Sequence, residues 1–95
     1  KLLKKMKIKV SNMVSDKGND IANQFIVKLD NSTYFQSYES VIVQKSHDTG
    51  EILLDEKYWD YSNTTRKYRN AFLRMTSKEV KAAIESGRFK LVNFN

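Results

Sequence analysis

The sequence predicts an α+β fold: an antiparallel β-meander of about five strands, followed by two short helices and a C-terminal strand. Two observations predict it. Up to residue 54, short β-favouring runs alternate apolar and polar side chains and are separated by polar turn clusters. From residue 61, apolar side chains recur with a helical period, and no Gly or Pro interrupts residues 64–75.

Five segments are typical of strands, because they are rich in β-branched and aromatic residues. They are residues 6–10, 22–29, 33–38, 40–45 and 51–54. The first alternates Met6, Ile8 and Val10 with lysines, which is the pattern of a half-buried strand. In the second, alternate residues from Phe25 to Leu29 share one face. The connecting turns, rich in Gly, Asn and Asp, are residues 15–20, 30–32 and 47–50.

The first helix is predicted over residues 64–75, with Ser62 as its N-cap. A spacing of 100° per residue defines a buried side and a polar side. The buried side holds Tyr61, Thr64, Thr65, Tyr68, Ala71, Phe72 and Met75. The polar side holds Asn63, Arg66, Lys67, Asn70 and Arg74.

The second helix is predicted over residues 77–86. Thr76 and Glu79 have the spacing of a capping box, in which each side chain bonds the other's backbone N–H. The buried side chains are expected to be Val80, Ala83 and Ile84, and Gly87 ends the helix. Residues 88–94 then form the last strand.

One domain is expected, because the chain has 95 residues. Met6 is the expected native start, so residues 1–5 are an upstream extension or a remnant of cloning, and residues 6–95 are a single α+β domain.

The net charge of +6 is unevenly distributed. Residues 1–10 hold five bases and no acid (+5), residues 11–60 hold four bases and nine acids (−5), and residues 61–95 hold eight bases and two acids (+6). A polyanion is therefore expected to meet the helical end.

Enzyme chemistry is not predicted. The chain has no Cys and one His, which excludes thiolate nucleophiles, Cys-based zinc sites and multi-His metal sites. Neither of the glycine-rich phosphate-binding motifs, GxGxxG and GxxxxGK(S/T), occurs in the sequence. No apolar run approaches the roughly 20 residues of a membrane span. We therefore predict no catalytic residue, no metal, no cofactor and no membrane partner.

The polar face of the first helix is the first candidate site, because Arg and Lys pair with phosphates and Arg or Asn can read base edges. The predicted nucleic-acid-binding residues are Arg66, Lys67, Arg69, Asn70, Arg74 and Lys78. The alternative is a solvated face that keeps a small protein soluble.

Aromatic side chains give a second candidate site. Tyr34, Tyr38 and Trp59 are possible anchors of a protein interface if they are exposed, and core residues if they are covered. The sequence leaves both alternatives open.

Five segments together resemble a family of small uncharacterised proteins encoded by tailed bacteriophages. They are residues 23–27 (NQFIV), 34–38 (YFQSY), 54–62 (LDEKYWDYS), 64–73 (TTRKYRNAFL) and 84–95 (IESGRFKLVNFN). The stretch YWDYS leading into KYRN is the specific part, and the resemblance spans residues 6–95. It implies a viral protein in the cytoplasm of the infected bacterial host, and it transfers no catalytic residue.

The sequence thus predicts a small non-enzymatic phage accessory protein that binds nucleic acid, DNA or RNA, through a basic helix face. The alternative is a protein-interaction module that binds or inhibits a host or anti-phage defence protein, or a minor virion component. Its partner would be an acidic protein, and a homo-oligomer is also possible.

Overall fold

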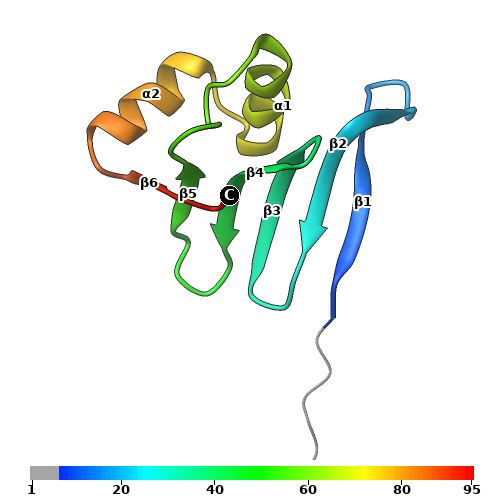
Figure 1. Cartoon of the computed structure of the whole chain (residues 1–95), viewed down its shortest axis with the longest axis horizontal. Coiled ribbons are helices and arrows are strands. Elements are labelled where there is room, and N and C mark those ends of the chain that lie inside the picture. Colours follow the sequence, from blue (N-terminus) through cyan, green and yellow to red (C-terminus); the bar gives the residue numbers. More distant parts are fainter. Residues whose placement is uncertain (1–6) are drawn as a thin grey trace, which may run out of the picture.

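The computed structural model describes residues 7–95 and contains one six-stranded sheet and two helices (Figure 1). The elements are β1 (Lys9–Val14), β2 (Asp20–Lys28), β3 (Ser32–Ser37), β4 (Ser40–Ser46), β5 (Ile52–Asp55), α1 (Asn63–Leu73), α2 (Ser77–Glu85) and β6 (Phe89–Val92). The predicted α+β fold is confirmed. The expectation that residues 1–5 are an extension, and that Met6 is the native start, lies outside the described residues.

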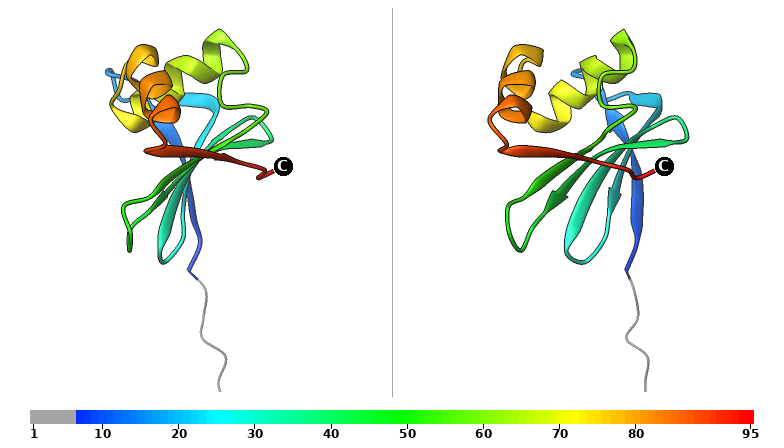
Figure 2. Two further views of the ribbon diagram at one scale, coloured as in Figure 1. Left: turned by 90° about the vertical axis from the view of Figure 1, so that its left-hand side faces the viewer. Right: turned by 60° about the vertical axis from the view of Figure 1, so that its left-hand side comes forward.

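The sheet follows the chain order from β1 to β6. Strands β1 to β5 form the predicted antiparallel meander, whereas β6 pairs with β5 in parallel. A parallel pair needs a crossover connection, which α1 and α2 provide. Both helices therefore gather on one side of the sheet, while the C-terminal residues run out on the other (Figure 2).

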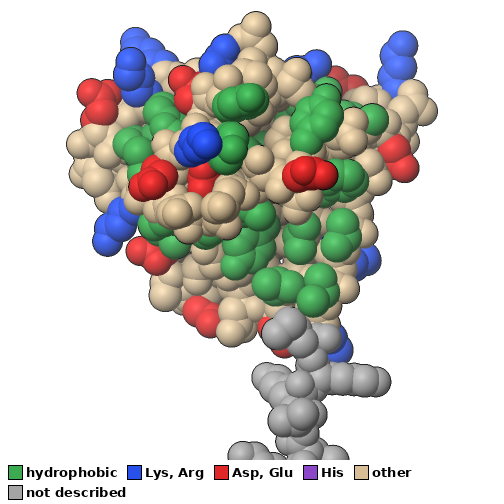
Figure 3. Space-filling view, in the orientation of Figure 1, with side chains coloured by type: hydrophobic (Ala, Val, Ile, Leu, Met, Phe, Trp, Pro, Cys, Tyr) green, Lys and Arg blue, Asp and Glu red, His purple; other side chains and the backbone are tan. Residues whose placement is uncertain are grey.

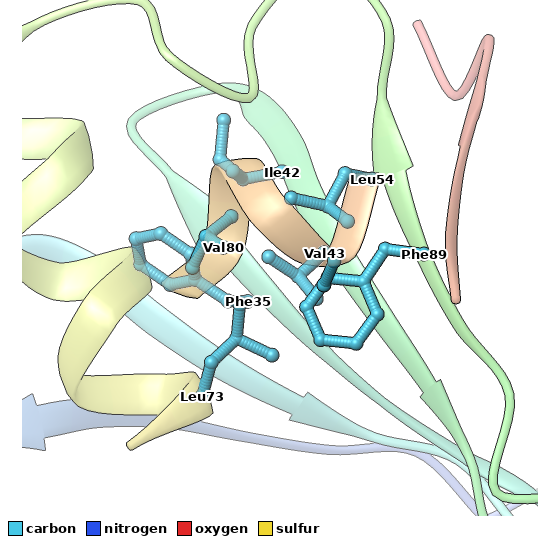
Figure 4. Packing of buried hydrophobic residues seen from close by; sticks show 8 residues of the cluster. Phe35, Ile42, Val43, Leu54, Leu73, Val80 and Phe89 are labelled. Atoms are coloured by element: carbon cyan, nitrogen blue, oxygen red, sulfur yellow. The ribbon is translucent and has the colours of Figure 1, made fainter. Parts of the chain in front are cut away.

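The hydrophobic core lies between the sheet and the helices (Figure 4). Phe35, Val43 and Leu54 lie on neighbouring strands, and Phe35 pairs with Val43, which pairs with Leu54. The helices pack onto this row. The buried cluster consists of Phe35, Ile42, Val43, Leu54, Leu73, Val80, Ala83 and Phe89.

The buried face of α1 differs from the prediction. Its buried residues are Thr65, Arg69 and Leu73, which form one i, i+4 row. Tyr61, Thr64 and Ala71, which the pattern placed on the buried side, are exposed. Most of the predicted side is confirmed, since Thr65 is buried and Tyr68, Phe72 and Met75 pack against the core. The prediction was wrong for Arg69, which it assigned to the solvent by its charge. The structure instead satisfies that charge with partners inside the protein.

Strand β1 also differs from the prediction. It begins at Lys9 rather than at residue 6, and it continues to Val14 because it pairs along β2, with Val10 opposite Val27. Ile8 and Val10 are 59% and 60% exposed, although the alternation predicted a half-buried strand. These side chains are exposed because β1 is an edge strand of the sheet. The helices pack farther along the sheet, where α1 contacts β3 and α2 contacts β6.

The helix ends follow the sequence signals. Ser62 Oγ accepts a hydrogen bond from the Thr65 N–H at 3.1 Å. Thr76 Oγ1 accepts from the Glu79 N–H at 3.1 Å, and Glu79 Oε1 accepts from the Thr76 N–H at 2.9 Å. The predicted capping box is confirmed, and Gly87 follows α2 with a φ of +83°, which favours glycine.

Replacing Thr76 by alanine is expected to destabilise the protein by about 1 kcal/mol, because the first turn of α2 loses its hydroxyl acceptor. Urea unfolding measures this change. Lys81→Ala, an exposed substitution on the same helix, is the control and should leave the free energy of unfolding nearly unchanged. Equal midpoints for the two variants would contradict the role of the cap.

The sheet face opposite the helices is partly covered by the end of the chain. The Phe94 ring meets the Tyr34 ring edge-to-face, with centroids 6.1 Å apart. The Asn95 amide bonds both backbone groups of Val41, at 3.1 and 3.0 Å. These contacts hold the C-terminal residues across the strands.

Candidate nucleic-acid interface

The guanidinium of Arg69 connects the segment before α1 with both helices. Its side chain is fully buried, with 0% exposure. Nη1 donates to the Trp59 carbonyl at 2.7 Å and to Asp60 Oδ1 at 3.2 Å. Nη2 donates to Asn70 Oδ1 at 2.9 Å and to Ser77 Oγ at 3.1 Å. The guanidinium also lies over the Trp59 ring, 5.4 Å from its centroid.

The prediction that Arg69 contacts nucleic acid is therefore wrong. Burial lowers the pKa of Arg69, the hydrogen bond and charge of Asp60 partly offset this, and the charge of Arg66 adds to the lowering. A guanidinium remains protonated in proteins, so its donors must be satisfied where it lies. Here they bond the protein itself, and Arg69 positions its neighbours.

The side-chain amide of Asn70 also forms its hydrogen bonds within the protein. Its Oδ1 accepts from Arg69, and its Nδ2 donates to Ser77 Oγ at 2.9 Å. The side chain is half-buried between the two helices. The predicted role of Asn70 in reading base edges is therefore not supported by its placement, since both ends of the amide already have partners.

A groove lies between the segment that precedes α1 and the start of α2. It has a volume of about 320 Å³. We call it the basic groove, and its lining residues are Trp59, Asp60, Arg66, Ser77, Lys78 and Lys81. Three cationic side chains thus face one carboxylate and a half-buried indole ring. This arrangement joins an aromatic surface to positive charge.

Within the basic groove, Arg66 is partly neutralised. Its Nη1 lies 3.2 Å from the Asp60 carbonyl oxygen and 3.5 Å from Asp60 Oδ1. Its Nη2 donates to Asn63 Oδ1. Lys78 and Lys81 are exposed one turn apart on α2, so they supply the remaining positive charge.

Two predicted residues lie elsewhere on α1. Lys67 is exposed, with its ammonium 5.3 Å from the centroid of the Tyr68 ring. Arg74 caps the C-terminal end of α1 in the left-handed region, with a φ of 56°. Burial, and after it the positive charge of Arg74, lowers the pKa of Lys45. Arg74 is exposed and is not among the residues that line the basic groove.

Lys81 belongs to the basic groove but was not among the predicted residues. Its spacing of three from Lys78 places both on one face of a helix, and this signal was available in the sequence. Which face of α2 meets the Trp59 segment depends on tertiary packing, so the sequence alone does not assign Lys81 to a site.

A second groove lies on the other side of residues 58–62, with a volume of about 680 Å³. We call it the aromatic groove, because four rings contribute to its walls: Phe25, Tyr38, Tyr58 and Tyr61. Tyr38 and Tyr61 are 58% and 69% exposed. Such exposure is high for aromatic side chains and leaves their rings available to a partner.

The three predicted interface anchors do not form one surface. Tyr34 is half-buried beneath Phe94 on the sheet face away from the helices. Tyr38 lines the aromatic groove, and Trp59 lines the basic groove. Of the three side chains, Tyr38 is exposed, whereas Tyr34 and Trp59 are half-buried.

Across residues 7–95, no helix is long and apolar enough to cross a membrane. The same part of the chain contains no group of three or more His, Asp or Glu side chains that could hold a metal ion.

Comparison with known proteins gives one finding. A family model described as a family of unknown function (DUF8033) matches residues 8–88. No curated protein and no solved structure matches the chain.

Proposed function

Since the chain belongs to the family of unknown function DUF8033, we propose a function from the site itself: a small non-enzymatic protein that binds nucleic acid, DNA or RNA. The observation that carries this proposal is the basic groove, where the Trp59 ring lies among Arg66, Lys78 and Lys81. Cationic side chains pair with phosphates, and aromatic rings stack on bases.

The contacts beneath the groove support this proposal. Arg69 bonds the backbone of Trp59 and the hydroxyl of Ser77, so the two walls are held at a fixed separation. A site whose walls are fixed in advance loses little conformational entropy when it binds. The buried arginine thus supports binding without touching the ligand.

The charge distribution also supports it. Residues 61–95 hold eight bases and two acids, whereas residues 11–60 hold four bases and nine acids. Figure 3 shows several Lys and Arg side chains around the helical end, with Asp, Glu and hydrophobic side chains among them. Such separation attracts a polyanion to the helices and orients it as it approaches.

The biological setting is proposed from the sequence resemblance alone. The protein would be an accessory protein encoded by a tailed bacteriophage, and it would act in the cytoplasm of the infected bacterial host. There it would bind nucleic acid during infection.

A protein-interaction module is the second candidate, and one observation favours it. At the β1 edge, Ile8, Val10 and Val14 are 59%, 60% and 60% exposed. An exposed apolar edge strand is a template for pairing with another chain. The partner would be an acidic host or anti-phage defence protein that the module binds or inhibits, a virion component, or a second copy of this chain.

Reversing two charges in the basic groove tests the proposed function. In the variant Lys78→Glu/Lys81→Glu, affinity for a labelled oligonucleotide is expected to fall at least roughly tenfold at low salt. The slope of log affinity against log salt should become less steep by about 0.7–0.9 for each lost phosphate contact. Fluorescence anisotropy at several salt concentrations measures both quantities.

A matched control changes the charge equally at another place. Lys17→Glu/Lys28→Glu alters two exposed lysines outside the groove, in the β1–β2 turn and on β2. This control should keep most of the affinity. If the wild type shows no binding at low salt, or if the two variants lose affinity equally, the proposed site is wrong.

A further inference from the structure

The aromatic groove and the basic groove share a wall. Asp60 lines the basic groove, and its chain neighbour Tyr61 lines the aromatic groove. A polymer that crosses this wall would contact both. We propose that the aromatic groove takes one unstacked base of a single-stranded nucleic acid whose phosphates lie in the basic groove, an inference that rests on the proposed function.

The rings of the aromatic groove suit a base. Tyr38 and Tyr61 are both more than half exposed, so their faces are open to a ligand. Tyr61 is held against Tyr58 in an edge-to-face contact, with centroids 5.3 Å apart and an interplanar angle of 64°. Single-strand-binding proteins use aromatic rings in this way, because every base has a face that can stack.

The charge of the groove favours a base over a phosphate. Among the described residues that line it, Glu39 is the one charged side chain. A carboxylate repels phosphate oxygens but accepts hydrogen bonds from the amino group of a base, as carboxylates do with the N4 amino group of cytosine. The occupant should therefore be a base with an exocyclic amino group.

Two residues in the wall of the aromatic groove have unusual backbone conformations. Asn23 and Tyr38 both have left-handed conformations, with φ of 63° and 55°, and the Tyr38 N–H donates to the Asn23 carbonyl at 2.7 Å. This conformation is strained for a tyrosine, and such strain gathers at functional sites. Both residues line the groove, so the strained backbone is part of its wall.

A buried amide lies directly beside the groove. Gln24 is 1% exposed, and neither its Nε2 nor its Oε1 has a hydrogen-bond partner in residues 7–95. It lies between Asn23 and Phe25, and it pairs across the sheet with Ser37, so three lining residues surround it. Unpaired buried amides are rare in a structural core, so each one needs an explanation. A ligand that enters the groove would supply the partner that Gln24 lacks.

Single strands and duplexes distinguish this inference from a general affinity for phosphates. A base in a duplex is paired and stacked, so it must be extruded before it can enter a groove. Single strands about 12 nucleotides long should bind roughly tenfold more tightly than duplexes of the same length and salt. The same affinity measurement with a DNA and an RNA oligonucleotide of one sequence shows which of the two is preferred.

Variants of the groove assign the preference to Tyr61 and Glu39. Tyr61→Ala should remove the preference for single strands and leave duplex affinity unchanged, whereas Tyr61→Phe, which keeps the ring, should retain it. The wild type should bind oligodeoxycytidine more tightly than oligothymidine, and Glu39→Gln should reduce that difference. Circular dichroism shows that each variant is folded.

Three results would overturn the inference. Equal affinity for single strands and duplexes, with binding still weakened by Lys78→Glu/Lys81→Glu, removes the base site and leaves the proposed function standing. An unchanged preference in Tyr61→Ala removes this groove as its location. Absence of binding to either form removes both proposals.

Discussion

Replacing Arg69 by methionine is expected to lower the free energy of unfolding by about 3 kcal/mol, because hydrogen bonds to charged groups each contribute about 1.5–3 kcal/mol. The substitution removes donors to Trp59, Asn70 and Ser77, and these groups are left facing an apolar side chain. Asp60 loses its nearest cation, but it is 45% exposed and can be hydrated. The loss is a large part of the stability of a domain this size.

Two further variants make the effect of Arg69 specific. Arg69→Lys keeps the charge but not the planar set of donors, so it should recover only part of the loss. Arg88→Met removes an exposed arginine and should stay within about 0.5 kcal/mol of the wild type. Urea unfolding followed by circular dichroism compares the three. An Arg69→Met variant as stable as Arg88→Met would contradict the structural role of this guanidinium.

Replacing Asp55 by alanine is expected to destabilise the protein by about 3–5 kcal/mol, the range of the larger single-residue effects. The carboxylate is 1% exposed. Its Oδ2 accepts from the N–H groups of Lys57 and Tyr58 at 3.0 and 2.9 Å, and its Oδ1 accepts from the Phe94 N–H at 2.9 Å. It thus fixes both the segment after β5 and the C-terminal residues.

The contribution of Asp55 to the free energy of unfolding should depend on pH. Burial by itself would raise the pKa of Asp55, but hydrogen bonds from Phe94, Tyr58, Asn95 and Lys57 outweigh it, so the pKa lies below the ordinary value of 3.8. Because the folded state has the lower pKa, this stability is complete above the unfolded pKa and is lost as the pH falls through the folded value.

Thermal unfolding between about pH 7 and pH 2 tests that dependence. The difference in stability between the wild type and Asp55→Asn should be largest near neutral pH and should shrink below about pH 4. Asp48→Asn, in the exposed turn after β4, is the control and should follow the wild type. A difference that stays constant down to pH 2 would show that the ionised carboxylate is not the stabilising group.

Local signals account for the part of the fold that the sequence predicts. The capping box at Thr76 and Glu79 and the left-handed Gly87 depend on neighbouring residues alone. The meander follows from alternation and turn residues, and its bounds agree within a few residues. The parallel pairing of β6 with β5 depends on how α1 and α2 cross the sheet, which no local pattern specifies.

The candidate site was predicted only in part, for a related reason. Charge identified Arg66 and Lys78, which lie in the basic groove. The same criterion misplaced Arg69, because a buried arginine is recognised by its partners, and these come from three separate segments. The rings of residues 58–61 divide between two grooves, and an aromatic run in the sequence does not reveal that division.

The fluorescence of Trp59 gives the most direct test of nucleic-acid binding in the basic groove. Trp59 is the only tryptophan in the chain, and it lines that groove. Titration with a single-stranded oligonucleotide should quench its emission to saturation, with the same affinity as anisotropy reports, and added salt should reverse the quenching. Saturable binding by anisotropy with unchanged Trp59 emission would contradict the location of the interface.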